Sequence, residues 1–437
     1  MAQVAITLTD RNMIDINLIR EQPAWVKAQI SKLHTEAPVE QILALDTRRR
    51  QLLQQVEEDK HRRNVVSKSI GHTQSAAERQ TRIEEMRAVA AHIQILDEQL
   101  RQIDQGLRES MLWMPNLPHP SVPVGTSDLE NVVLRQEGIL PIFDFTPIPH
   151  WDLGPRLGII DFERGVKLSG TRFYLLKGAG SRLQRALIQW MLDLHVSQHN
   201  YTEIYPPFMV RREMMVGAGQ LPKFADNIYH DAEEDYWWLG TAEIALTNIH
   251  RDEILTVEQL PAKYVSYTPC FRREKMSAGR DVRGIKRGHQ FDKVEMYRLT
   301  TPETSYDALE EMVEDAADVC RALEIPFRLV QMCTGDLGFQ AAKKYDLEMW
   351  APGCGEWLEV SSISNCEAFQ ARRANVRFRR AKGAKPEFVH TLNGSGLALP
   401  RVMVAVLETY QQADGTVAVP SVLQPFMGGV DRICHAS

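Results

Sequence analysis

Cysteine is scarce in this chain, and none occurs before Cys270. The 437 residues contain six cysteines, all in the last two-fifths, and no two of them form a Cys-x-x-Cys pair. This usage excludes a disulfide-dense scaffold, and the spacing gives no support for a zinc site. We therefore expect six reduced thiols, most of them buried, and no zinc.

Long apolar runs are also missing. No stretch is apolar enough to cross a membrane, and the N-terminus lacks the basic-then-apolar pattern of a signal peptide. We therefore expect a cytoplasmic protein without membrane contact. The apolar share of 44% can supply a sizeable core, and the length predicts two or three domains. A net charge of −6 argues against a general nucleic-acid-coating protein, so any contact with nucleic acid must be local.

One local stretch runs against this acidic background. The segment 270–297 is predicted to form two strands joined by a long loop. Seven Lys/Arg lie between Arg272 and His289, against Glu274 and Asp281, a net charge of +5. The alternatives are a solvated surface hairpin and a site for an anion such as phosphate, which Arg binds in bidentate fashion. The order of the side chains favours a nucleotide, with an Arg on phosphate, Glu274 on the adenine amino group and Phe291 on the base.

The spelling of this stretch identifies a family. F-R-R-E from Phe271, followed by H-Q-F-x-K-V-E from His289, resembles motif 2 of class II aminoacyl-tRNA synthetases. The intervening S-A-G-R-D-x-R-G is similar to bacterial-type seryl-tRNA synthetases in particular, and the resemblance extends over roughly 13–427. It implies a ligase that uses ATP and Mg²⁺ to convert L-serine to seryl-adenylate. The seryl group is then transferred to tRNA(Ser), and charging of tRNA(Sec) is left open.

Two further stretches carry the resemblance. Thr241 and Glu243 follow an apolar segment and match the family's serine-binding loop, although an N-cap with a surface acid is the commoner meaning of such a pair. Gly394 and Gly396 allow close backbone approach, and with Arg401 before an apolar helix they resemble motif 3. A lone Gly-x-Gly would be weak evidence.

The resemblance implies a role for each matching residue. The serine pocket would be formed by Thr241, Ala242, Glu243, Arg272, Glu295 and Ser395. The ATP contacts would be Arg272, Arg273, Glu274, Phe291, Glu359, Val360, Ser361, Ser362 and Arg401. Arg272 and Arg401 would be the catalytic cations, on opposite sides of the phosphates. Glu359 and Ser362 offer the oxygen ligands that Mg²⁺ prefers.

A few positions depart from the usual family spelling. They are Ala245, Lys275 with Met276, Gly288, Ile363 and Pro400. None of them has a chemical role above. Pro400 matters most, because it restricts Leu399 and so is expected to re-aim Arg401.

The N-terminal part has a different pattern. Apolar residues recur at 3/4 spacing over 42–70 and 86–114, which predicts an antiparallel coiled-coil hairpin with a turn at 71–75. Residues 60–82 carry a net charge of +5, so the positive charge is at the tip. The alternatives are a solvated hairpin and an arm that lies along a nucleic-acid backbone. The resemblance implies an arm that holds the long variable arm of tRNA(Ser), with tip candidates Lys60, Arg62, Arg63, Arg79 and Arg82.

The predicted fold class is α+β, in two domains. Residues 1–115 would form the helical tRNA-binding arm, with 1–12 as a poorly ordered extension. The proline-rich stretch after 115 marks the boundary, and 116–437 would form a class II synthetase catalytic domain around an antiparallel sheet. A short helical segment is expected at 15–33. The periodicity at 181–200 predicts a core helix. Only the resemblance of this segment to motif 1 of the family implies a homodimer interface.

Three alternative functions predict residues or elements that differ from those in this sequence. A synthetase-like paralogue that does not charge tRNA is expected to lack Arg272, Glu295 or Arg401, and all three are present. An amino acid:carrier-protein ligase on the same catalytic core would lack the helical arm. A coiled-coil interaction protein does not account for three ATP motifs in this order. A resistance copy that tolerates serine-adenylate analogues stays open.

Overall fold

The computed structural model describes residues 14–70, 74–275 and 283–435. These residues form two compact units, one of 14–30 with 35–115 and the other of 31–34 with 116–435. The predicted extension 1–12 and the first half of the predicted turn at 71–75 lie outside the described residues. Within the described part of the chain, no helix is long and apolar enough to span a membrane.

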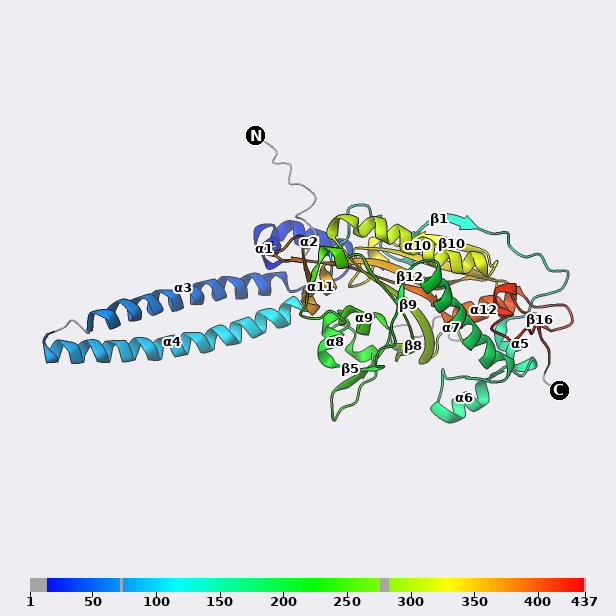
Figure 1. Cartoon of the computed structure of the whole chain (residues 1–437), viewed down its shortest axis with the longest axis horizontal. Helices are drawn as coiled ribbons and strands as arrows, with labels where there is room; N and C mark the ends of the chain where they lie inside the picture. The colour runs from blue at the N-terminus through cyan, green and yellow to red at the C-terminus, as the bar shows by residue number, and fades with distance from the viewer. Residues whose placement is uncertain (1–13, 71–73, 276–282, 436–437) are drawn as a thin grey trace, which may run out of the picture. The chain divides into compact units, whose positions relative to one another are not determined.

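The helical unit consists of two short and two long helices (Figure 1). They are α1 (Ile16–Glu21), α2 (Pro23–Lys32), α3 (Val39–Ile70) and α4 (Ala76–Met111). The prediction of one helical segment over 15–33 is therefore wrong, because a second helix begins at Pro23. Proline is tolerated at the first position of a helix, where its missing N–H breaks no hydrogen bond. Ser75 caps α4, since its side chain accepts a hydrogen bond from the backbone N–H of Glu78.

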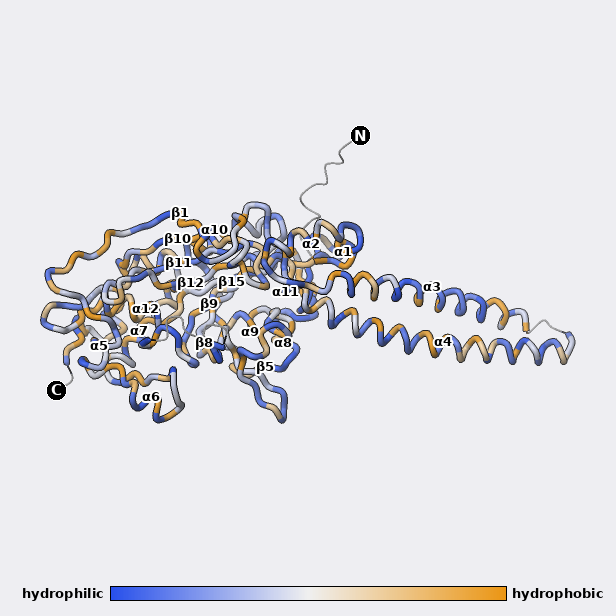
Figure 2. The backbone as a smooth tube through the Cα atoms, turned by 180° about the vertical axis from the view of Figure 1, so that it is seen from behind, coloured by the Kyte–Doolittle hydropathy of each residue, from blue (hydrophilic) through white to orange (hydrophobic). Residues whose placement is uncertain are grey.

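Helices α3 and α4 form the predicted antiparallel hairpin, and apolar positions recur along both (Figure 2). Apolar side chains from both helices form two buried clusters along the seam: Leu52, Val56 and Leu96, and Met86, Val89 and Ile93. Two polar seam positions are paired across the helices, with Arg49 Nε 2.6 Å from Asp104 and Asp59 2.7 Å from His92. Polar seam residues can therefore be tolerated without loss of pairing between the helices.

An eight-stranded sheet forms the centre of the other unit. Its strand order is β1-β10-β11-β12-β15-β9-β8-β4, and every neighbouring pair is antiparallel except β4 with β8. The strands are β1 (Val132–Glu137), β4 (Thr202–Glu203), β8 (Ala262–Phe271), β9 (Gln290–Thr300), β10 (Phe327–Gln331), β11 (Lys343–Ala351), β12 (Glu356–Glu367) and β15 (His390–Ala398). With the helical hairpin, this sheet confirms the predicted α+β fold class.

Helices cover both faces of the sheet. The large core packs α7 (Ala179–Ser197), α10 (Ser305–Ala322) and α12 (Leu399–Thr409) against one face. A smaller core packs α9 (Glu243–Thr247) and α11 (Phe369–Ala374) against the other. Four of the six cysteines are buried; Cys354 is partly exposed and Cys434 is exposed.

The remaining elements are short. The helices are α5 (His150–Arg156), α6 (Phe162–Ser169) and α8 (Arg212–Gly217). The strands are β2 (Ile160–Asp161), β3 (Leu175–Leu176), β5 (Met209–Arg211), β6 (Tyr236–Trp238), β7 (Ile254–Thr256), β13 (Arg377–Arg379), β14 (Glu387–Phe388), β16 (Val417–Ala418) and β17 (Arg432–Ile433).

A buried arginine joins the sheet to α10. The Arg298 side chain is 1% exposed, and its guanidinium lies 2.5 Å from Asp315 and 2.7 Å from Glu311. It also donates a hydrogen bond of 2.8 Å to the Tyr201 hydroxyl. A buried cation is tolerated when it is ion-paired and hydrogen-bonded. Removing it leaves its carboxylate partners with uncompensated negative charge, which destabilises the fold.

Arg298→Met is therefore expected to lower the free energy of unfolding by about 3–5 kcal/mol, because the largely buried Asp315 loses its arginine and, among the described residues, keeps only the Tyr201 hydroxyl as a close donor. Denaturant unfolding followed by tryptophan fluorescence measures the change. The matched control is Arg380→Met, which removes an exposed arginine paired with Glu303 and Glu387 and should cost at most about 1 kcal/mol. Equal losses in the two variants would contradict the role given to Arg298.

Candidate functional site

A polar cavity of about 580 Å³ lies on the sheet where the predicted motifs meet. Strand β9 contributes alternate residues, Phe291, Lys293 and Glu295, because successive side chains on a strand point to opposite faces. The neighbouring β15 contributes Asn393 and Ser395 in the same way, and Ser395 is the register partner of Glu295. The two strands thus form a continuous polar floor.

Most predicted site residues line this cavity. They are Glu243, Arg272, Glu274, Phe291, Glu295, Glu359, Val360, Ser362, Ser395 and Arg401. Thr241 instead lines an adjoining cavity of about 300 Å³, which shares Asn227, Arg272 and Asn393 with the first. Three predicted residues line neither: Ala242 is fully buried, the Ser361 hydroxyl donates to the backbone carbonyl of Ser395, and the Arg273 guanidinium lies over the Tyr229 ring.

Arg272 lies between the two cavities. Its Nε donates a hydrogen bond of 2.9 Å to the backbone carbonyl of Gly240, and its guanidinium carbon is 5.2 Å from the centre of the Phe291 ring. Two residues on, the Glu274 carboxylate lies 3.4 Å from Arg287, which belongs to the returning part of the basic loop. The guanidinium of Arg272, directly after β8, is therefore held by the Gly240 carbonyl and presents its charge to the cavity.

The acidic end of the cavity holds two buried carboxylates. Glu243 is 5% exposed and accepts a hydrogen bond of 2.5 Å from Gln370, while Glu295 is 1% exposed and ion-paired with Lys293. Burial, together with the negative charge of Glu295, raises the pKa of Glu243 to about 7. This end of the cavity therefore favours a ligand that carries a positive charge.

The opposite end holds Arg401 and a set of oxygen atoms. Arg401 Nη1 lies 2.6 Å from the backbone carbonyl and 3.3 Å from the carboxylate of Glu359. Asp346 faces Ser362 across β11 and β12, and its Oδ1 has no hydrogen-bond partner among the described residues. Burial and the nearby charge of Glu359 raise the pKa of Asp346. An unpartnered carboxylate oxygen behind Glu359 and Ser362 fits a site for a hard divalent cation.

Two of the departures from the usual family sequence, Pro400 and Gly288, lie at the cavity wall. Pro400 lies in the first turn of α12, where proline is well tolerated, and both Pro400 and Arg401 line the cavity. Gly288 also lines the cavity, and an added Cβ would lie 3.0 Å from the backbone carbonyl of Gln290. Met276 lies outside the described residues.

Besides Gly288 and Pro400, six lining residues were not predicted as site residues. They are Asn227, Lys286, Arg287, Lys293, Asn393 and Ala398. The strand period could have revealed Lys293 and Asn393, which lie two residues from Glu295 and Ser395. Lys286 and Arg287 had been counted in the basic loop but not assigned. Asn227 lies in an isolated turn far from any motif, and no local pattern points to it.

Comparisons with known proteins agree over nearly the whole chain. A family model described as the seryl-tRNA synthetase N-terminal domain matches residues 13–118, and one described as the tRNA synthetase class II core domain (G, H, P, S and T) matches 225–410. The chain is 61% identical over 422 residues to the serine–tRNA ligase of Roseiflexus sp. (strain RS-1), covering 96% of this chain and 99% of that one. The serine–tRNA ligase of Dehalococcoides mccartyi (strain CBDB1) is 59% identical over 416 residues, 95% of this chain and 99% of that one.

Two solved structures are similar as well. The seryl-tRNA synthetase from Pyrococcus horikoshii complexed with ATP has a TM-score of 0.91 and 38% identity, covering 97% of this chain and 100% of that one. The cytoplasmic serine–tRNA ligase from Naegleria fowleri in complex with AMP has a TM-score of 0.85 and 30% identity, covering 97% of this chain and 99% of that one.

The raised pKa of Glu243 predicts a pH-dependent cost to stability. Between pH 4.5 and about 7 the folded state keeps a proton that an unfolded glutamate has lost, so stability falls as pH rises through this window. Glu243→Gln removes this group. Its free energy of unfolding should therefore fall by about 3 kcal/mol less than that of the wild type between pH 4.5 and about 7. Thermal melting at pH 5 and pH 8 measures the difference. Exposed Glu163→Gln is the control, and identical pH slopes for wild type and Glu243→Gln would contradict the prediction.

Proposed function

Because the chain belongs to the seryl-tRNA synthetase family, we propose that it uses ATP and Mg²⁺ to activate L-serine as seryl-adenylate and transfers the seryl group to tRNA(Ser). The observation that carries this proposal is one cavity that is acidic at one end and cationic toward the other. It is lined by the segment that follows β8 and by β9, β12, β15 and α12. Serine offers an ammonium group to the acidic end, and ATP offers phosphates to Arg272, Arg287 and Arg401.

The activation step needs no nucleophile from the protein. An oxygen of the serine carboxylate attacks the α-phosphorus, the bond between that phosphorus and the oxygen leading to the β-phosphate breaks, and pyrophosphate leaves. Arg272 lies between the two cavities and so can hold the carboxylate and the α-phosphate together. Arg401, from the start of α12, would neutralise charge on the leaving phosphates.

The nucleotide base would be held by Phe291 and Glu274. Phe291 offers a ring face, and Glu274 offers a carboxylate acceptor to the adenine amino group, supported by Arg287. Arg273 and Ser361 would act from behind the cavity rather than at its wall. Arg273 lies over Tyr229, and Ser361 holds the backbone of Ser395.

The serine pocket would use Glu243 and Glu295 for the ammonium group, and Thr241, Ser395 and the adjacent buried Ala242 for the rest of the amino acid. A pocket built to hydrogen-bond the serine hydroxyl rejects alanine, because alanine would leave buried polar groups unpaired. Threonine would be excluded by crowding against the same wall.

Mg²⁺ would be held by Glu359 and Ser362, and Asp346 is an additional candidate ligand. When bound, the ion would offset the negative charge of the ATP phosphates. The protein's own part is to keep these oxygens on two paired strands, opposite Arg272 across the cavity floor.

The helical hairpin would hold the long variable arm of tRNA(Ser). Arg62 and Arg79 are exposed near its tip and have no hydrogen-bond or ion-pair partner among the described residues. Arg63 is half-buried, while Lys60 and Arg82 are already paired with Asp97 and Glu78. An exposed arginine without an ion-pair partner can bind a backbone phosphate without first breaking another interaction. Charging of tRNA(Sec) by the same site stays an open alternative.

A homodimer is proposed through the motif 1 helix α7 and the segment after it. Val196, Tyr205 and Met209 are exposed apolar side chains on this part of the chain, and such residues suit a protein interface. The cytoplasmic location expected from the sequence stays a prediction.

The adenylation site is tested by pyrophosphate exchange with ATP and Mg²⁺, with serine, threonine, alanine and glycine presented separately. Exchange with serine alone is expected, because only serine satisfies the hydroxyl-binding groups without crowding. Exchange with none of the four by folded protein would overturn the proposal. Equal exchange with alanine would contradict the hydroxyl-binding pocket.

The arm is tested by the double variant Arg62→Glu with Arg79→Glu. It should raise KM for tRNA by about tenfold or more and reduce the salt dependence of tRNA binding by ~1–2 in slope, because about two phosphate contacts are lost. Serine-dependent pyrophosphate exchange without tRNA should not change. The control is Arg101→Glu, an exposed arginine on α4 about 33 Å from Arg79 along the helix. A loss of the same size in the control would contradict a role for the tip.

A further inference from the structure

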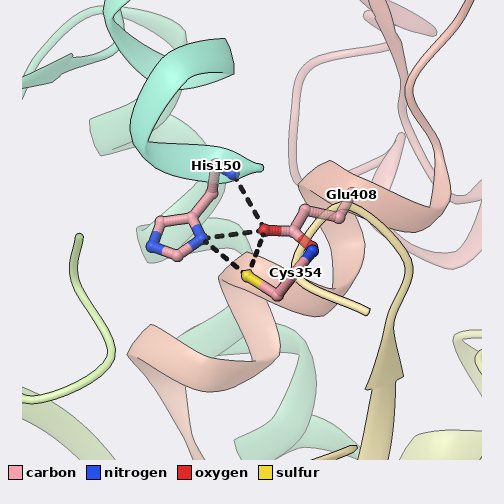
Figure 3. A group of neighbouring side chains, drawn as sticks. All are labelled: His150, Cys354 and Glu408. Carbon is pink, nitrogen blue, oxygen red and sulfur yellow. Dashed lines mark hydrogen bonds and ion pairs between the residues drawn. The ribbon is translucent and has the colours of Figure 1, made fainter. Parts of the chain in front are cut away.

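A buried cluster lies behind the cationic end of the cavity. It consists of His150 at the start of α5, Cys354 in the turn between β11 and β12, and Glu408 near the end of α12 (Figure 3). His150 and Glu408 are fully buried, and the potential ligand atoms of the three residues lie within 4.8 Å of one another. These are residue types that bind metal ions, so a metal site and a hydrogen-bonded junction are the two alternatives.

The hydrogen bonds define the protonation of His150. The backbone N–H of Ile285 donates to His150 Nε2 at 3.2 Å, so Nε2 carries no proton. The neutral ring therefore has its proton on Nδ1, which donates to Glu408 Oε1 at 2.8 Å. A metal on Nδ1 would require an imidazolate, because Nε2 is already an acceptor. The geometry therefore favours the hydrogen-bonded junction.

Glu408 fixes the ring in this state. Its carboxylate also accepts hydrogen bonds from the backbone N–H of His150 at 2.8 Å, from the backbone N–H of Cys354 at 2.9 Å and from the Cys354 thiol at 3.1 Å. Burial acts to raise the pKa of Glu408, but these donors hold the pKa below its usual value. The carboxylate stays ionised and keeps the imidazole proton on Nδ1.

The returning part of the basic loop runs directly over this ring. Gly284 has a φ of +74°, and an added Cβ would lie only 2.0 Å from His150 Nε2, so only glycine fits. Residues near Gly284 contact the same part of the unit. The Arg283 guanidinium lies 4.5 Å from the ring centre of Trp151 in α5, and Lys286 lies 2.5 Å from Glu356 at the start of β12. Each described residue from 283 to 286 thus touches α5 or the adjacent turn.

The next residues, Arg287 and Gly288, line the cavity. We propose that His150 is a positioning residue for ATP: by accepting the Ile285 N–H, it fixes the returning limb of the basic loop so that Lys286 and Arg287 face the nucleotide. Through Glu408, the same junction ties this limb to α12, whose first turn carries Arg401. The cations of two separate motifs are thereby held at a constant separation. This inference rests on the proposed function only for the identity of the nucleotide.

A matched pair of substitutions separates the two hydrogen bonds of His150. Asparagine can place its amide N–H near the Nδ1 position and keep the bond to Glu408, but it is too short to reach Ile285. Glutamine can place its amide oxygen near the Nε2 position and accept the Ile285 N–H. His150→Asn should raise KM for ATP in serine-dependent exchange, and Kd for ATP by calorimetry, by about tenfold, with KM for serine changed less than twofold. His150→Gln should restore most of the ATP affinity.

Two further variants serve as a control and a second route. Cys354→Ala removes only the thiol bond to Glu408 and should leave Kd for ATP within twofold. Gly284→Ala disturbs the same contact from the loop side and should weaken ATP binding as His150→Asn does. This second variant keeps the test available if a change at His150 prevents folding.

Several results would overturn the positioning role. They are equal ATP affinities of the Asn and Gln variants, equal changes in KM for ATP and for serine, or a fall in melting temperature with no change in ATP binding. Tight stoichiometric binding of Zn²⁺ to the full chain, lost in His150→Asn, would establish the metal alternative instead. If the wild type binds ATP but shows no serine-dependent exchange, the proposed function fails, while the calorimetric comparison still decides the role of His150.

Discussion

The alternation of side chains along β9 is the constraint on which the rest of the catalytic unit depends. Val294, Met296 and Arg298 point into the core formed with the helices, while Lys293 and Glu295 point into the cavity. A one-residue slip in register would exchange these two sets, placing Lys293 and Glu295 in the core and Val294 and Met296 in the site. The antiparallel pairing of β9 with β8 and β15 therefore holds the fold and the site together.

Charge is distributed along the cavity in the same ordered way. The acidic end has Glu295 on the floor and Glu243 at the start of α9, with Lys293 as a counter-charge. The cationic groups come from two elements outside this floor, the basic loop and α12. The pairing of β8 with β9 holds the two ends of the loop, where the backbone N–H of Arg272 donates to the carbonyl of His289. Residues 283–286 in its returning part are linked to the rest of the unit by packing on α5 and on the turn after β11. The buried His150–Glu408 pair supplies that link.

Much of this could be predicted from sequence because its signals are local. The heptad seams predict the hairpin, the motif spellings predict a seryl-tRNA synthetase, and both predictions are confirmed. Lys293 was within reach of the strand period. Asp346, Asn227 and the His150 cluster were not, because their partners are far away in the chain and no periodicity connects them. The break between α1 and α2 was missed because Pro23 was read as part of a helix rather than as its first residue.

The most direct test of the account is a crystal structure with a non-hydrolysable seryl-adenylate analogue bound. The account predicts the adenine ring against Phe291, the phosphate mimic at Arg272, and the seryl ammonium group between Glu243 and Glu295. It also predicts residues 283–288 in their present path over His150. An analogue bound in the reverse orientation, with its adenine at the two carboxylates, would contradict the central claim that one sheet face holds both substrates in this order.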